Sequence, residues 1–151
     1  MVCLYMFFSK SFGYALRGVL YVALVSEENR RVQVDEIAQK LAVPKHFLAK
    51  IMNRVVKEGV LDSTKGPFGG FSVNKETLSS PLIRLLSITG GIEQFSSCVL
   101  KLSICDKTNP CPLHFLMEKS RDDLMKKFSQ TTIADLLKQD KNIFIGSIAI
   151  A

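Results

Sequence analysis

The 151-residue sequence lacks the features that would place the protein in a membrane or outside the cell. No run approaches the ~18 consecutive apolar residues that a transmembrane helix needs. The first residues, MVCLYMFF, have no basic leader, and their apolar run is too short for a secretion signal. The apolar segment IFIGSIAI near the other end is also short, and we expect it to be a packed or frayed tail. These absences favour a cytoplasmic protein without a membrane partner.

Motifs of redox enzymes are missing as well. The sequence has no Cys-x-x-Cys pair and no glycine-rich nucleotide-binding motif, which makes an electron-transfer or redox enzyme a weak hypothesis. It has no internal repeat and no low-complexity tract. We expect neither enzymatic activity nor a small-molecule substrate.

Cysteine is scarce, with four residues in the chain, but three of them lie close together. Cys98, Cys105 and Cys111 fall within fourteen residues, and His114 follows. A chain of this size with 47% apolar residues buries roughly 70% of its unfolded surface and needs no disulfide to hold its core. Because cytoplasmic thiols stay reduced, clustered cysteines there bind metal or sense redox state more often than they form structural disulfides.

This segment offers three sulfur ligands and one nitrogen ligand. The six-residue and five-residue gaps between the cysteines are long for a zinc knuckle and suit an irregular loop around an iron–sulfur cluster. We expect Pro112 to open the next helix with Cys111 at its N-cap, where the helix dipole favours the thiolate. A zinc site with the same ligands, a clusterless thiol switch and chance clustering of buried cysteines remain alternatives.

Positive charge is concentrated in the first part of the chain. Residues 1–89 hold 12 Lys and Arg against 7 Asp and Glu, a net charge of +5, whereas residues 90–151 hold 8 against 7, a net charge of +1. This division favours a polyanion-binding N-terminal region. Charge that serves only solubility is the alternative.

The apolar periodicity of the first 60 residues predicts three helices: residues 11–25, the segment VDEIAQKLAV, and a third helix from Pro44 to Gly59. We expect this third helix to bury Phe47, Leu48, Ile51 and Val55 and to expose its basic residues. The second and third helices, joined by a tight turn, describe a helix-turn-helix. Two short strands, Val60 to Thr64 and Phe71 to Val73, then flank a glycine-rich turn and predict a hairpin wing.

Further helices are predicted after the wing. Residues 81–88 form a short helix ended by two glycines, and Thr132 with Asp135 resembles a capping box that opens a last helix. Residues 112–128 form a longer helix, which we expect to pair with its copy in a homodimer, although its apolar side could also be ordinary core. The apolar residues on that side are Leu113, Leu116, Met117, Leu124 and Phe128.

Three elements together resemble the Rrf2 family of winged-helix transcription regulators: YALR in the first helix, KGPFGGF in the wing, and the three-cysteine segment. The resemblance covers about residues 8–130. It implies a homodimer that binds DNA. It also implies an iron–sulfur cluster, with [2Fe–2S] favoured over [4Fe–4S], and this cluster could be lost when the protein is purified. The IscR-like branch of the family implies that His114 completes the ligand set. The sequence departs from the family at Phe68, where glycine is usual, and at Gly13, where nitric-oxide-sensing members carry an aspartate ligand.

We therefore expect a mainly α fold with a small β-hairpin wing and a long C-terminal dimerisation helix. Residues 1–89 would form the DNA-binding domain, 90–111 a cysteine-bearing sensor loop, and 112–151 the dimerisation helix and tail. A regulator controlled by protein docking, without a cluster, is the runner-up hypothesis. The DNA-contacting residues would be Pro44, Lys45, His46, Ala49 and Lys50 at base edges, Lys65 and Gly66 in the wing, and Arg54 and Lys57 at phosphates.

Overall fold

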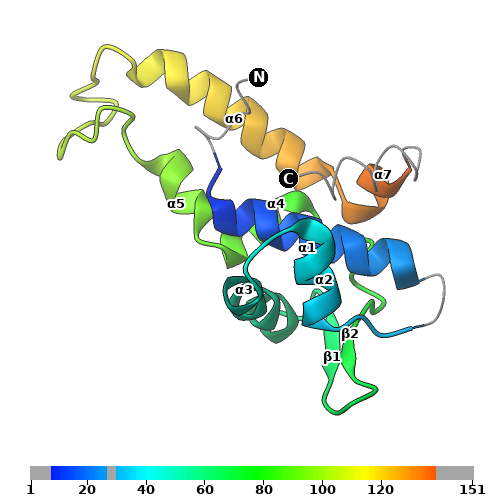
Figure 1. The fold of residues 1–151 in the computed structure, drawn as a ribbon. Helices are drawn as coiled ribbons and strands as arrows, with labels where there is room; N and C mark the ends of the chain where they lie inside the picture. Colours follow the sequence, from blue (N-terminus) through cyan, green and yellow to red (C-terminus); the bar gives the residue numbers. More distant parts are fainter. Residues whose placement is uncertain (1–7, 27–29, 139–151) are drawn as a thin grey trace.

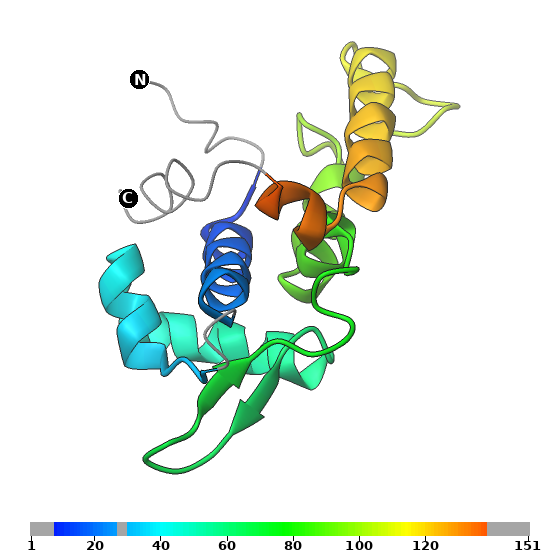
Figure 2. The same cartoon turned by 90° about the vertical axis from the view of Figure 1, so that its right-hand side faces the viewer.

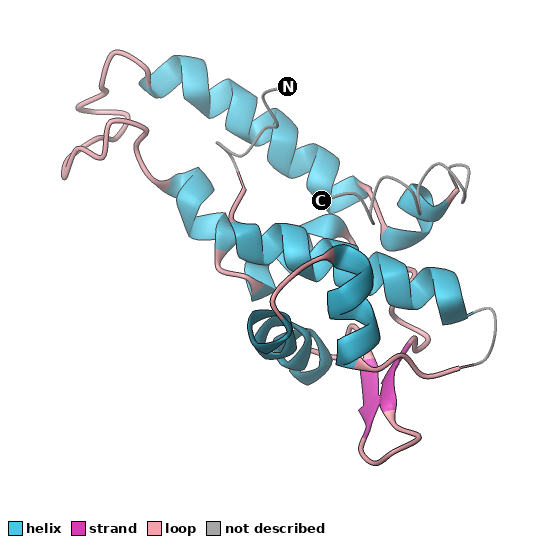
Figure 3. Ribbon diagram, viewed as in Figure 1, coloured by secondary structure: helices cyan, strands magenta, loops and turns pink. Residues whose placement is uncertain are grey.

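The computed structural model describes residues 8–26 and 30–138, so the segment IFIGSIAI and Cys3 lie outside the described residues (Figure 1). The described chain is mostly helical with one antiparallel hairpin, which confirms the predicted fold class (Figure 3). Its elements are α1 (Lys10–Val25), α2 (Val34–Leu41), α3 (Lys45–Lys57), β1 (Asp62–Thr64), β2 (Gly70–Ser72), α4 (Leu82–Ile88), α5 (Gly91–Ser96), α6 (His114–Gln130) and α7 (Ile133–Leu137).

Helices α1 to α3 form where the apolar periodicity predicts them. The side chain of Ser9 caps α1 by accepting a hydrogen bond from the backbone N–H of Phe12 at 3.2 Å. Ala42 ends α2 in the left-handed conformation, with φ 51°, and turns the chain sharply into α3. The predicted burial of Phe47 is wrong, since this side chain is 42% exposed and Met52 is buried instead. Phe47 lies beside the buried stripe of α3 and meets the ring of Tyr14 edge-on, with centroids 5.7 Å apart.

The wing pairs Asp62 with Ser72 and Thr64 with Gly70. The first strand is shorter than predicted, because Val60 and Leu61 are buried in the core before β1 begins, and the second begins one residue earlier than predicted, at Gly70. Phe71 exchanges two backbone hydrogen bonds with Val32, at 2.8 and 2.9 Å, which ties the wing to the segment that precedes α2. The hairpin is therefore anchored to the helical body through β2.

The C-terminal helices return to the N-terminal body. The capping box of Thr132 and Asp135 is confirmed, and Ile133 is fully buried. The backbone of α7 also joins the segment before α4, because the N–H of Ile133 donates to the carbonyl of Ser80 at 3.0 Å. The expected N-cap at Cys111 is wrong: α6 begins at His114 with Leu113 as its N-cap, since the N–H of His114 closes a turn onto the carbonyl of Cys111 at 3.0 Å.

Two ends of the molecule are distinct in both views. Helix α3 and the wing lie at one end, and the loop between α5 and α6 lies at the other (Figures 1 and 2). Among the described helices, none is long and apolar enough for a bilayer crossing.

Two glycines of α1 provide a matched stability test. A Cβ added at Gly18 would lie 2.6 Å from the sulfur of the fully buried Met52, whereas one added at Gly13 has no atom within 4 Å. We expect Gly18→Ala to destabilise the protein by roughly 1–3 kcal/mol through overpacking. Gly13→Ala should instead stabilise it by up to about 1 kcal/mol, because alanine favours a helix interior. Denaturant unfolding at one protein concentration measures both, and equal effects would contradict the predicted packing.

Candidate DNA-reading surface and metal centre

The outer face of α3 presents the predicted DNA-contacting residues to solvent. Pro44, Lys45, His46, Lys50, Arg54 and Lys57 are exposed, and Ala49 is partly exposed. The buried stripe of Leu48, Ile51, Met52 and Val55 fixes this orientation. Lys45 forms an exposed ion pair with Asp35 of α2, at 2.6 Å between Nζ and Oδ1. Surface pairs of this kind are weak, so a phosphate could displace the carboxylate.

The tip of the wing exposes Lys65 and Gly66. Gly66 has φ 107°, a backbone conformation that favours glycine. The side chain of Gln33 donates a hydrogen bond to the carbonyl of Pro67 at 2.9 Å, which links the tip to the start of α2. The tip is thereby held in a defined position relative to the helix-turn-helix.

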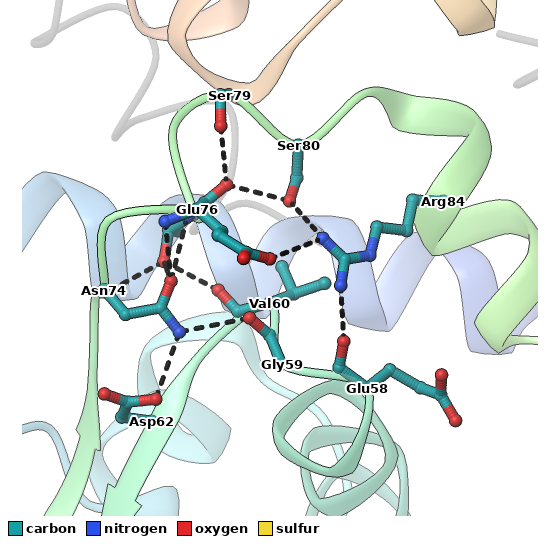
Figure 4. A network of polar contacts seen from close by, with 10 residues as sticks. Glu58, Gly59, Val60, Asp62, Asn74, Glu76, Ser79, Ser80 and Arg84 are labelled. Carbon is teal, nitrogen blue, oxygen red and sulfur yellow. Dashed lines mark hydrogen bonds and ion pairs between the residues drawn. The ribbon is translucent and has the colours of Figure 1, made fainter.

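A polar network joins the end of α3, the wing and α4 (Figure 4). Asn74 donates to the carbonyl of Gly59 at 3.1 Å and to Asp62 at 3.0 Å. Arg84 of α4 donates to the carbonyl of Glu58, at the C-terminus of α3, at 2.6 Å. These bonds satisfy carbonyls that the end of a helix leaves open and fix the angle between α3 and the wing.

Sequence reasoning missed a pair of arginines beside the wing. Arg30 and Arg31 line an open groove together with Ser26, Phe68, Ser72 and Val73. The Arg30 guanidinium holds the pKa of Glu36 below its usual range through two hydrogen bonds of 2.8 Å. Burial of the Tyr21 side chain, together with its hydrogen bond to Glu36, raises the pKa of Tyr21 to about 12. The signal in the sequence was the pair of arginines that ends SEENRR, but this segment was interpreted as a polar break between helices.

At the other end of the molecule the structure brings the three predicted cysteines together. The sulfur atoms of Cys98, Cys105 and Cys111 all lie within 4.8 Å of one another. The sulfurs of Cys98 and Cys111 are 3.7 Å apart. The backbone N–H of Cys111 points at the sulfur of Cys105 at 3.5 Å. Cys111 is buried, whereas the other two are partly exposed.

His114 lies at the edge of this cluster. Its Nδ1 is 3.3 Å from the sulfur of Cys105, but it does not join the compact group of three sulfurs. Its Nε2 is buried and has no hydrogen-bond partner among the described residues. A buried imidazole nitrogen without a hydrogen-bond partner costs free energy of folding. This ring therefore suits a site in which a further group contacts it.

The thiols of Cys98 and Cys105 differ in their pKa values. Backbone N–H groups, that of Leu102 first and that of Leu100 next, lower the pKa of Cys98 to about 7. The N–H of Cys111 acts in the same direction on Cys105, but desolvation and the neighbouring thiols outweigh it and raise the pKa of Cys105. Because like charges this close repel, the first thiolate to form opposes the ionisation of its neighbour. Cys98 therefore has a larger thiolate fraction at neutral pH than Cys105 and is the more nucleophilic of the two.

This difference predicts the order of alkylation in metal-free, reduced protein. Because the thiolate is the reactive form, labelling of Cys98 by iodoacetamide should rise with pH through about 7 and then level off. Cys105 should still be labelled slowly there, because its pKa is raised. Peptide mass spectrometry after short labelling pulses measures both rates. Faster labelling of Cys105 at pH 7 would contradict the prediction.

Helix α6 has no buried residue in the single chain. Of the predicted interface residues, Leu113 and Met117 are partly exposed, whereas Leu124 and Phe128 pack against the core of their own chain. The ring of Phe128 stacks on that of Phe8 with centroids 5.2 Å apart. Phe115 and Leu116, at 59% and 67% exposed, leave an uncovered apolar surface near the start of the helix.

The helix-turn-helix, the hairpin and the basic outer face of α3 define a winged-helix protein. The sequence profile of the Rrf2 family, described as an iron-dependent transcriptional regulator, matches residues 8–139. A protein of Aquifex aeolicus named as an HTH-type transcriptional regulator is 36% identical over 142 residues, covering 92% of this chain and 97% of the other. The chain therefore belongs to the Rrf2 family of transcriptional regulators.

Solved structures share the fold. CymR of B. subtilis, titled the global cysteine regulator of that organism, aligns with a TM-score of 0.70 at 18% identity, covering 93% of this chain and 100% of that one. IscR of T. potens aligns with a TM-score of 0.67 at 18% identity, covering 89% of this chain and 88% of that one.

Proposed function

We propose that this regulator is a homodimer whose affinity for promoter DNA depends on an iron–sulfur cluster held by Cys98, Cys105, Cys111 and His114. The convergence of three thiols within 4.8 Å carries this proposal. Residues 1–89 would bind DNA, 90–111 would sense, and 112–151 would hold the dimer. The description of the family as iron-dependent supports iron over other metals.

The four candidate ligands form two close pairs of side chains. Two thiolates on one tetrahedral ion with ~2.3 Å bonds lie about 3.8 Å apart, and Cys98 and Cys111 are separated by 3.7 Å. Cys105 and His114 form the second pair, at 3.3 Å. A [2Fe–2S] cluster with one histidine ligand would be held by these three thiolates and the imidazole. When bound, such a cluster would supply a redox-dependent charge at this end of the molecule.

The DNA-binding part of the proposal rests on the opposite end. The exposed side chains of α3 would enter the major groove, with Pro44, Lys45, His46, Ala49 and Lys50 at base edges. Arg54 and Lys57 would contact phosphates, and Lys65 and Gly66 would reach the neighbouring minor groove or its phosphates. The exposure of these residues on two fixed elements supports this assignment.

A physical connection between the two ends supports a coupled response. The cysteine loop joins α5 to α6, and both helices pack against α4. Arg84 of α4 in turn holds the last turn of α3 through the carbonyl of Glu58. A change that shifts α5 or α6 on α4 would thereby reach the DNA-reading helix.

DNA titration at several salt concentrations tests the DNA-binding function. If each subunit neutralises ~4 phosphates, the dimer's log K should fall against log salt with a slope of about −7. Half-sites about one helical turn apart, ~34 Å, should be preferred. Lys65→Ala should weaken binding to all sequences alike, whereas His46→Ala and Lys50→Ala should blur base preference. A flat salt dependence would contradict the proposal.

A clusterless thiol switch is the second candidate, because the 3.7 Å contact between Cys98 and Cys111 is short enough for these sulfurs to join with small movements. The absorption spectrum of anaerobically purified protein separates the alternatives. Visible cluster bands support the cluster. A colourless protein with stoichiometric zinc supports a zinc site, and a colourless metal-free protein supports the thiol switch or control by protein docking.

A further inference from the structure

The wing of this protein ends in an uncovered aromatic ring. Phe68, in the turn between β1 and β2, is 89% exposed, the largest exposed fraction among the large hydrophobic side chains of the described residues. Single exposed apolar residues are common on protein surfaces. Phe68 differs because it lies in the turn between β1 and β2. This hairpin projects from the body at the same end of the molecule as α3 (Figure 2).

The turn presents this ring on a fixed support. The N–H of Gly69 donates to the carbonyl of Gly66 at 2.9 Å, and Gln33 holds the carbonyl of Pro67 from the other side. A Cβ at Gly69 would lie 2.1 Å from the carbonyl oxygen of Thr64, so the chain closes on itself directly behind Phe68. Because the backbone of the turn is held in this way, it loses little conformational freedom when the wing binds.

Positively charged side chains lie near the ring. Lys65 is exposed in the same turn, and Arg30 and Arg31 line the open groove that Phe68 borders. Arg30 also pairs with Glu36 at 2.8 Å, whereas Arg31 is exposed. An apolar tip with cations nearby suits the DNA minor groove, where stacked bases lie between two rows of phosphates.

We propose that Phe68 enters the minor groove as a wedge that partly unstacks one base step and bends the duplex. This inference rests on the proposed DNA-binding function. Proteins that bend DNA from the minor groove insert side chains of this kind, and pyrimidine–purine steps yield most easily. The wing would then select sequences by deformability in addition to the base contacts of α3.

The test uses the full-length protein and a duplex selected from a random pool by retention on the wild-type protein. Donor and acceptor dyes at the duplex ends report bending, and 2-aminopurine at successive steps reports unstacking. We expect wild-type protein to bring the ends closer and to raise 2-aminopurine fluorescence at one step in each half-site. Phe68→Ser should lose both signals, whereas Phe68→Leu should keep them, because leucine is still an apolar wedge.

Matched controls separate the wedge from general DNA binding. Phe68→Ser changes no charge, so the slope of log K against log salt should stay the same, whereas Lys65→Ala should reduce the slope by about one per subunit and keep the bend. Thermal unfolding of Phe68→Ser should match wild type, since the ring is exposed. A wild-type complex that stays straight, or a Phe68→Ser complex with the wild-type bend, overturns the wedge. Failure of wild-type protein to retain any duplex overturns the DNA-binding function and the wedge with it.

Discussion

Serine in place of Cys98, Cys105 or Cys111 is expected to abolish stoichiometric binding of iron and sulfide. Each replacement removes a thiolate that is both a ligand and a counter-charge to the metal. The protein should stay folded, because none of the three cysteines belongs to the hydrophobic core cluster and Cys111 is the only one of them that is buried. Anaerobic reconstitution followed by iron and sulfide analysis measures the loss. Cys3→Ser is the matched control and should bind as wild type does.

His114 should behave differently from the cysteines. His114→Ala removes a neutral donor that water or a nearby oxygen can replace, so a labile cluster should survive. His114→Cys should hold the cluster more firmly and lower its reduction potential, because added negative charge disfavours reduction. Wild-type protein that takes up stoichiometric zinc in place of iron and sulfide would contradict the cluster. So would a variant that lacks all three cysteines yet keeps its full signal response.

A lysine at Leu116 is expected to convert the proposed homodimer to a folded monomer. Leu116 is 67% exposed in the single chain, so the substitution leaves the chain's own packing intact. Burial of its charge in an apolar contact between two α6 helices would cost several kcal/mol. Met117→Lys, at the neighbouring predicted interface position, should act in the same direction. Sedimentation velocity at micromolar concentration, with circular dichroism as a check on folding, measures the result.

The choice of position matters for this experiment. Leu124 and Phe128 pack against the core of their own chain, so lysine there would destabilise the fold as well as any dimer. Ser129→Lys is the matched control, since it also adds one positive charge, at an exposed and already polar position of α6. Leu116→Lys and Met117→Lys proteins that both remain dimeric would contradict the assignment of α6 as the interface.

Local patterns in the sequence predicted the elements but not every side chain. The 3.6-residue spacing of apolar positions located α1, α2 and α3, and Thr132 with Asp135 located α7, because these signals depend on near neighbours in the chain. Phe47 was misplaced because whether a side chain beside the buried stripe is covered depends on what α1 places over it. Cys111 was misplaced at the N-cap because the turn through Pro112 and Leu113 moves the start of α6 to His114.

The family, the winged helix-turn-helix and the segment that carries the candidate ligands could all be inferred from the sequence. The motifs and spacings that indicate them depend on residues that are near one another in the chain. The tertiary structure was needed to show that the three cysteine sulfurs, whose residues are separated by six and five positions in the chain, converge within 4.8 Å. It also decided that Arg30 and Arg31 lie beside Phe68 at the wing. Both arrangements depend on how irregular loops are held by distant elements, and the spacing of residues along a flexible chain does not fix their separation in space.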